Sequence, residues 1–273
     1  MSTVRARAMS PRSDGPADPV ARRSPRLCRF FAGVMRRQMA QNFRAVRLSR
    51  GGLDAVPAGR PLVVVANHPS WWDPAFFIVL AGALFDGRES YGPIDAGMLA
   101  RYRFMGRIGL FGLDADPRRG AAQFLRVGGA IAADPRRMLW VTGQGDFADP
   151  RLRPVALKGG VARLMLRRPD LVALPLAVEY PFWSEKRPEA LARFGDPLEC
   201  RAGEDADTLN VRLEAGLGGT MDDLARDAMA RDPARFERLI TGTKGVGGVY
   251  GAWGRLSAAL RGRRYTPEHM EET

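Results

Sequence analysis

Residues 61–73 read PLVVVANHPSWWD, an apolar run that ends in a cluster of polar and aromatic side chains. Five consecutive apolar residues, 62–66, are typical of a buried β-strand. The cluster leads into residues 74–85, a mainly apolar stretch of helical length that we predict to be a helix. The order of strand, short polar loop and helix is the beginning of a parallel crossover unit.

The same alternation continues towards the C-terminus. Short apolar runs predict strands at residues 109–113, 138–142 and 171–178, and residues 119–133 and 155–166 predict helices. Strands separated by helices of this length require crossover connections. The sequence therefore predicts an α/β fold with a mostly parallel central sheet flanked by helices.

Residues 25–50 carry apolar side chains at spacings of three and four, with arginines largely between them. This pattern predicts a basic amphipathic helix, either a membrane-associating element or a helix whose apolar face packs on the domain core. Residues 1–24 lack apolar periodicity, so we expect a disordered basic tail. We predict one folded domain at residues 51–255, with a helical segment at 203–240 and a glycine-rich loop at 241–254. A polar C-terminal tail follows at 256–273.

Charge is unevenly distributed along the 273 residues, whose formal net charge is +12. The first 50 residues contain twelve arginines against two aspartates, an asymmetry typical of proteins that meet an anionic polymer or membrane. Two cysteines are too few for a disulfide-stapled secreted module. The apolar run 75–85 is too short to span a bilayer, and the arginine-rich start does not resemble a signal peptide. We therefore expect a cytoplasmic protein.

His68 and Asp73 are the residues best suited to catalysis. The chain has two histidines, and the other, His269, lies in the polar tail. Ligands of α/β sheets bind beyond the carboxyl ends of the strands, where His68 lies, and imidazole accepts protons near neutral pH. A carboxylate on the first turn of the next helix can bond one ring nitrogen and leave the other free as a base. The same residues also fit a purely structural interpretation, in which Ser70 and Asp73 form a helix cap beside a loop histidine.

The N-H-x-x-x-x-D pattern of residues 67–73 resembles the first motif of the glycerolipid acyltransferases, the 1-acylglycerol-3-phosphate acyltransferase type, over roughly residues 55–200. The resemblance implies the fold of that family for an acyltransferase domain at 51–255. It also implies an O-acyltransferase in which His68 is the general base, oriented by Asp73. The acceptor hydroxyl then attacks the thioester of acyl-CoA or acyl carrier protein. The donor is a substrate, so no cofactor is implied, and the sequence offers no metal-ligand spacing.

Three later stretches resemble the other motifs of the family, with departures. Residues 109–115 (GLFGLDA) lack the arginine of the second motif. Residues 142–147 (TGQGDF) keep the glycine of the third motif but replace its glutamate and arginine, and residues 172–176 (VALPL) resemble the fourth. The candidate substrate-binding residues are Asn67, Arg118, Arg119, Gln144 and Gly145.

The departures bear on the acceptor. In the family the third-motif arginine helps to hold glycerol phosphate, which Phe147 cannot do because it lacks the guanidinium fork. Either Arg118, Arg119, Arg151 or Arg153 takes its place, or the acceptor is another lysolipid or amphipathic alcohol, such as a non-phosphorus lipid or a glycolipid. We favour the second. Gln144 either hydrogen-bonds the acceptor or ties down its own loop.

The implied partners are the acyl thioester donor, a lysolipid acceptor and an anionic membrane surface. We expect a peripheral protein on the cytoplasmic face of the inner (plasma) membrane. The alternative function is a catalytically silent lipid-binding relative, because the second and third motifs are degraded. Nucleic-acid binding is disfavoured, since the arginines alternate with phenylalanines rather than forming a recognition module. Four aromatic residues lie within the motif or directly after it, and they either contact lipid, line an acyl tunnel or pack in the core: Trp71, Trp72, Phe76 and Phe77.

Overall fold

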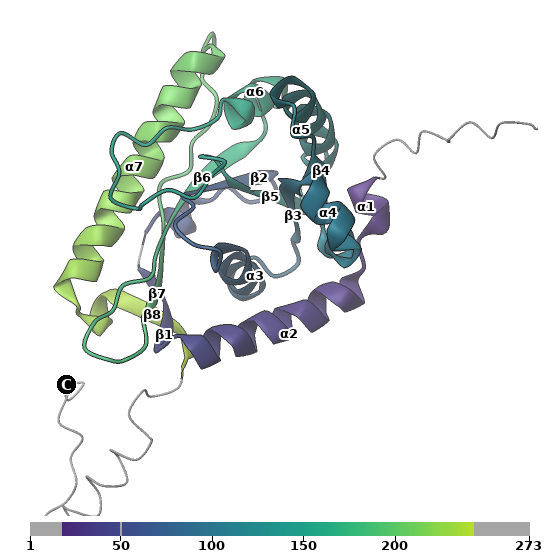
Figure 1. Ribbon diagram of the computed structural model, residues 1–273. Helices are drawn as coiled ribbons and strands as arrows, with labels where there is room; N and C mark the ends of the chain where they lie inside the picture. The colour runs from purple at the N-terminus through teal and green to yellow at the C-terminus, as the bar shows by residue number, and fades with distance from the viewer. Residues whose placement is uncertain (1–17, 50, 243–273) are drawn as a thin grey trace, which may run out of the picture.

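A computed structural model describes residues 18–49 and 51–242, which form an eight-stranded sheet with helices on both faces (Figure 1). The strand order is β4-β3-β5-β2-β6-β7-β1-β8. The strands are β1 (Ala45–Ser49), β2 (Leu62–Ala66), β3 (Glu89–Asp95), β4 (Leu110–Leu113), β5 (Arg137–Thr142), β6 (Val172–Glu179), β7 (Ala190–Phe194) and β8 (Phe236–Thr241). The five strands from β4 to β6 in this order are mutually parallel, whereas β7 is antiparallel to β6 and β8 is antiparallel to β1. The predicted α/β fold with a mostly parallel sheet is confirmed.

Helices cover the two faces of the sheet (Figure 1). On one face lie α2 (Pro25–Asn42) and α3 (Asp73–Leu84), and on the other lie α5 (Pro117–Ile131), α6 (Gly160–Arg167) and α7 (Ala206–Ala230). The shorter helices are α1 (Pro19–Arg22), α4 (Ala96–Arg101) and the 3-10 turns η1 (Gly52–Ala55), η2 (Arg103–Ile108) and η3 (Pro233–Arg235). Because side chains alternate along a strand, β2 sends Val63 and Val65 to one core and Leu62, Val64 and Ala66 to the other.

The predicted helix at residues 25–50 is wrong beyond Asn42. Residues 45–49 form β1, which pairs with β7 and β8 inside the sheet, so part of this segment belongs to the folded domain. Arg47 is buried because it pairs with Glu189 at 3.0 Å and lies over the ring of Trp183. The strand forms because of contacts with residues some 140 positions away in sequence, whereas the local spacing of apolar residues fits a helix equally well.

The apolar face of α2 packs on the protein itself, against α3 and η2. Met39 is fully buried, and Phe31 stacks on Phe104. Four arginines of the helix are exposed: Arg26, Arg29, Arg36 and Arg37. Of the two interpretations of this helix, packing on the domain core is therefore the one the structure favours for its apolar face.

Other boundaries differ at the ends of the chain. Part of the predicted tail, residues 19–22, is helical, because Asp18 caps α1 through the amide of Val20. The predicted helical segment 203–240 ends at Ala230, where Arg231 takes a positive φ of 51°, and residues 236–241 form β8. Residues 1–17, most of the predicted glycine-rich loop and the predicted tail at 256–273 lie outside the described residues.

No helix within residues 18–49 and 51–242 combines the length and apolarity needed to cross a bilayer.

Candidate active site

The candidate site lies beyond the carboxyl ends of β2, β5 and β6. Ala66 and Thr142, the last residues of β2 and β5, are in register with each other, and Ala66 is also in register with Leu176 of β6, which continues to Glu179. Gln144 lies two residues after Thr142, just as His68 lies two residues after Ala66. The register therefore brings together segments that are some 75 and 110 residues apart in sequence.

Asn67 fixes the exit of the chain from β2. Its buried side chain donates to the carbonyl of Val178 at 3.0 Å and accepts from the amide of Val178 at 2.8 Å. These two bonds continue the pairing of β2 with β6 beyond the last residue of β2. The predicted substrate-binding role of Asn67 is not what this geometry favours, because the amide is committed to the backbone and buried.

The backbone of His68 is held by the loop after β5. Its N–H donates to the side-chain oxygen of Gln144 at 3.1 Å, and its carbonyl accepts from the amide of Ala148 at 3.0 Å. Because a backbone N–H can only donate, the oxygen of the Gln144 amide must face it. The NH₂ group of Gln144 then remains as a donor with no acceptor among the described residues.

His68 and Asp73 form a close pair. Nδ1 of His68 lies 2.6 Å from Oδ2 of Asp73, which also accepts from the amide of Ser70 at 3.2 Å. Asp73 is the first residue of α3 and is fully buried, so the positive end of the helix dipole stabilises its carboxylate. Because the carboxylate accepts, Nδ1 carries the proton of neutral His68 and Nε2 has a free lone pair. Nε2 has no hydrogen-bond partner within the described part of the chain, and the histidine side chain is 18% exposed.

Tyr180 completes the surroundings of Asp73, and sequence reasoning missed it. Its hydroxyl donates to Oδ1 of Asp73 at 2.6 Å. Burial, followed by the nearby carboxylate of Asp73, raises the pKa of Tyr180 well above its ordinary value, so the phenol stays protonated. Tyr180 directly follows β6, and the only sequence signal for it is its place after the strand that resembles the fourth motif.

The aromatic residues near the motif divide into two groups. Phe76 and Phe77 are buried in the core beneath the sheet. Trp71 is 70% exposed and stacks on Trp72, whereas Phe147 is 63% exposed and its ring centre lies 4.4 Å from that of His68. Phe147 therefore borders the imidazole, Trp71 is exposed on the same loop as His68, and Phe76 and Phe77 lie in the core.

Gly145 shapes the loop after β5. Its φ is +83°, a conformation that favours glycine, and a Cβ there would lie 2.2 Å from Nζ of Lys158. The loop is closed by the amide of Lys158, which donates to the carbonyl of Gly143 at 2.8 Å. Gly145 therefore allows the backbone turn that places Gln144 beside the amide of His68.

The arginines that follow β4 lie at one edge of the sheet. Arg118 and Arg119 are exposed in the first turn of α5, and β4 is separated from β2 by β3 and β5. The amide of Asp116 donates to Asp114, and this bond, followed by the ion pair with Arg119 at 3.1 Å, lowers the pKa of Asp114. No contact of either arginine with His68 or Asp73 is found in the described chain, so the structure does not bring them into the site.

The other arginines considered as substitutes for the missing one are already paired. Arg151 binds Asp149 at 2.6 Å, and Arg153 binds Asp222 on α7 at 2.6 Å. Glu179 faces the same region, and burial raises its pKa although Arg153 opposes this effect. No described arginine therefore stands unpaired beside His68 in place of the one that Phe147 replaces.

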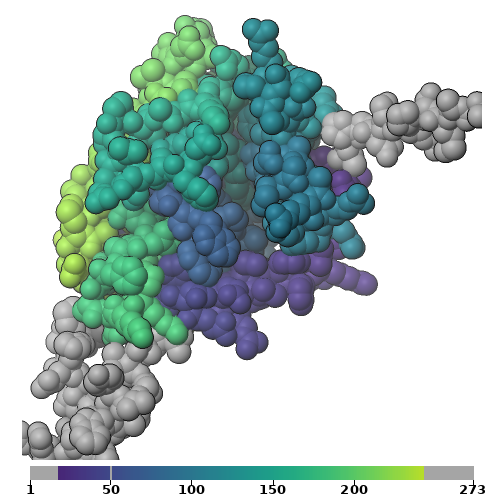
Figure 2. Space-filling model, viewed as in Figure 1, coloured from purple at the N-terminus to yellow at the C-terminus, as the bar shows by residue number. Residues whose placement is uncertain are grey.

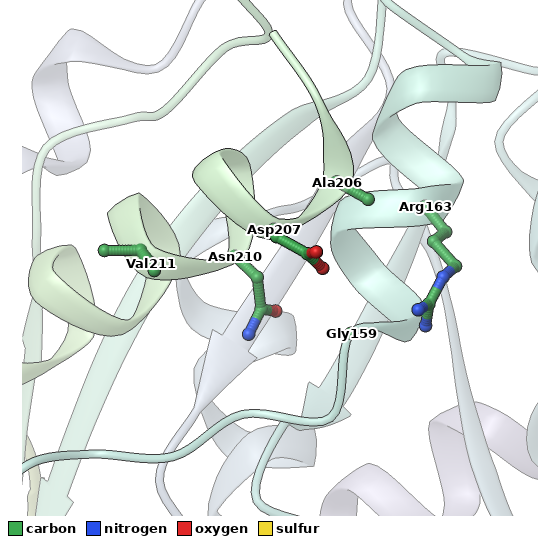
Figure 3. Close-up of a pocket in the computed structure, with 6 residues that line it drawn as sticks. All are labelled: Gly159, Arg163, Ala206, Asp207, Asn210 and Val211. Atoms are coloured by element: carbon green, nitrogen blue, oxygen red, sulfur yellow. The ribbon is translucent and has the colours of Figure 1, made fainter.

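A separate cavity of about 250 Å³ opens between the N-terminal turns of α6 and α7 (Figure 3). Its lining includes Arg163, Asp207 and Asn210 and none of the residues around His68. Elsewhere in the described chain, no three side chains of His, Cys, Asp or Glu converge to hold a metal ion.

Comparison with known proteins gives a likeness in fold. No family model matches the chain, and no curated protein matches it. The crystal structure of the 1-acyl-sn-glycerophosphate (LPA) acyltransferase PlsC from Thermotoga maritima superposes with a TM-score of 0.51 at 13% identity, over 73% of this chain and 80% of that one. The chain has the fold of that protein.

Proposed function

We propose that this protein is an O-acyltransferase that moves a fatty acyl chain from acyl-CoA or acyl carrier protein to a hydroxyl group. The observation that carries the proposal is the His68–Asp73 pair, joined at 2.6 Å, in which Nε2 has no partner among the residues that the structure describes. Its place after β2, in the fold of a lysophosphatidic acid acyltransferase, supports the same reaction class. In that class a base must remove one proton from an alcohol as it attacks.

The proposed reaction has one addition and one elimination. Nε2 of His68 takes the hydroxyl proton while the acceptor oxygen bonds to the thioester carbon. The tetrahedral intermediate then expels the thiolate, which leaves as a thiol with the proton from the imidazolium, and the acceptor keeps the acyl group as an ester. Asp73 holds Nδ1–H and stabilises the imidazolium between the two steps.

Negative charge on the thioester oxygen requires nearby donors. Among the backbone amides of residues 68–71 and 143–145, those of His68, Ser70, Gly143 and Gly145 already donate within the protein, and Pro69 has none. The amides of Trp71 and Gln144 have no acceptor among the described residues. We therefore propose these two, together with the NH₂ group of Gln144, as the groups that face the substrates.

The proposed acceptor is a lysolipid or related amphipathic alcohol whose recognition does not depend on a phosphate at the third-motif position. Phe147 lies against His68 at the position where the family carries arginine. The nearby Arg151 and Arg153 are engaged by aspartates. An apolar wall and a neutral amide donor from Gln144 suit an uncharged hydroxyl-bearing headgroup.

We also propose that the face around His68 docks on an anionic membrane. Exposed apolar side chains occur on α2, on α4 and η2, and on the loops after β2, β5 and β6: Phe30, Trp71, Met98, Phe104, Phe147, Leu152 and Phe182. Figure 2 shows these segments, in purple, blue, teal and green, on one side of the molecule. The exposed arginines of α2 lie beside Phe30, as expected where aromatic side chains enter lipid below phosphate groups.

Thiol release from a labelled long-chain donor tests the reaction. Wild type, His68→Ala and the matched control His269→Ala are each incubated with a panel of lysolipids and glycolipids. The acyl donor is either acyl-CoA or acylated acyl carrier protein. We expect acceptor-dependent release that falls at least ~100-fold in His68→Ala and persists in His269→Ala. Equal inertness of all three, with the donor still bound, would favour the catalytically silent lipid-binding function instead.

A further inference from the structure

The carboxylate of Asp73 has no spare oxygen. Oδ2 accepts from Nδ1 of His68 at 2.6 Å and from the amide of Ser70 at 3.2 Å, whereas Oδ1 accepts from the hydroxyl of Tyr180 at 2.6 Å. A buried carboxylate bonded on both oxygens cannot rotate without losing a bond. The orientation of Oδ2 towards the imidazole is thus set partly from the opposite side, by Tyr180.

Tyr180 is itself held firmly. Its ring centre lies 5.5 Å from that of Phe43 and 6.0 Å from that of Phe76, and Phe43 in turn contacts Trp72 edge to face. These rings come from the end of α2, from α3 and from the loop before it. The hydroxyl is therefore fixed by packing that does not depend on the bond it makes.

We propose that Tyr180 is a positioning residue that orients Asp73 and limits the basicity of His68. A neutral phenol that donates to Oδ1 draws negative charge away from Oδ2, so the imidazolium is stabilised less than by a carboxylate without that donor. His68 then remains neutral, and able to accept a proton, at a lower pH. The kinetic part of this inference rests on the proposed acyl transfer, and the titration part does not.

The test is the pH titration of the His68 ring by ¹⁵N NMR in wild type and Tyr180→Phe. The chain has two histidines, so a His269→Gln background leaves one imidazole to observe. We expect the midpoint in Tyr180→Phe to move to higher pH by ~0.5 unit or more. The ionisable groups on the neighbouring segments, Glu179 at the end of β6 and the Asp146–Lys158 pair on the loop after β5, are the same in both proteins.

Tyr91→Phe is the matched control. Tyr91 also donates its hydroxyl to a carboxylate, that of Glu89 at 2.9 Å, but it lies on β3, separated from β2 by β5. This variant should leave the His68 midpoint in place. In the acyl-transfer assay, Tyr180→Phe should lower kcat ~10-fold, leave KM unchanged and shift the acidic limb of the pH profile upward. Tyr91→Phe should keep the kcat, the KM and the pH profile of the wild type.

A second substitution should shift the His68 midpoint in the opposite direction without removing the hydroxyl. 3-Fluorotyrosine at position 180 is a stronger donor, so the His68 midpoint should move to lower pH. Unchanged midpoints in both Tyr180 variants would overturn the proposal. If the midpoints shift as expected and no donor or acceptor is turned over, the positioning role stands and the acyltransferase proposal fails.

Discussion

At the scale of single residues, the site is built from donors that saturate one carboxylate and leave one imidazole nitrogen free. The sequence could predict His68 and Asp73, because they are five residues apart, on the loop after β2 and at the start of α3. It could not supply Tyr180, which is 107 residues from Asp73 and reaches it only through the pairing of β2 with β6. Long-range partners of this kind leave no local pattern to read.

Glu179 gives a prediction for pH dependence. Burial raises its pKa above the ordinary value of 4.5, so Glu179 binds more protons in the folded protein than in the unfolded chain over the pH range between the two values. The contribution of Glu179 to the free energy of unfolding must then fall as pH rises from about 4.5. Glu179→Gln should lose this part of the pH dependence, as measured by urea denaturation at a series of pH values.

Glu237→Gln serves as the control for Glu179→Gln, because Glu237 is exposed on β8. It should keep the wild-type dependence of stability on pH. Parallel curves for wild type and Glu179→Gln through this range would contradict the assignment.

At the scale of elements, the strands that the sequence predicted are those whose apolar runs are continuous. β2 was predicted with its observed bounds, and β4, β5 and β6 within a residue. β1, β3, β7 and β8 were missed because each carries polar residues whose burial or pairing depends on distant partners. Arg47 in β1 is the clearest case, since only Glu189 and Trp183 make a buried arginine tolerable there.

The junction between β2 and β6 depends on Asn67. Asn67→Ala removes two hydrogen bonds and leaves the amide and carbonyl of Val178 buried without partners. We expect the free energy of unfolding to fall by about 2–4 kcal/mol, measured by chemical denaturation. Asn42→Ala, which removes only exposed bonds to Gln38 at the end of α2, should cost less than about 1 kcal/mol. Equal losses in the two variants would contradict this role of Asn67.

At the scale of the whole molecule, the face with the His68–Asp73 pair also has most of the exposed large apolar side chains of the described residues. Removing the first 50 residues is not a clean test of membrane docking, because it deletes β1, which lies between β7 and β8 in the sheet. Point substitutions on the exposed face leave the fold intact and are the better test.

The double variant Phe30→Ser and Trp71→Ser should float with anionic liposomes ~10-fold less well than wild type, since both side chains are exposed, one on α2 and one on the loop that carries His68. The control is Val211→Ser with Met229→Ser, which removes two equally exposed apolar side chains from α7. It should bind as wild type does. Equal loss in both double variants would show that the apolar residues around His68 have no special part in docking.

In the proposed reaction His68, held by Asp73, takes the hydroxyl proton while the acyl group passes from the thioester donor to the acceptor oxygen. The most direct measurement is the amount of acceptor ester formed per thiol released, by mass spectrometry, in wild type, Asp73→Asn and the exposed control Asp86→Asn. We predict one ester per thiol in wild type and Asp86→Asn, and a rate lower by ~1000-fold in Asp73→Asn, whose amide cannot accept from three donors. Thiol released without ester, or an unchanged rate in Asp73→Asn, would contradict the account.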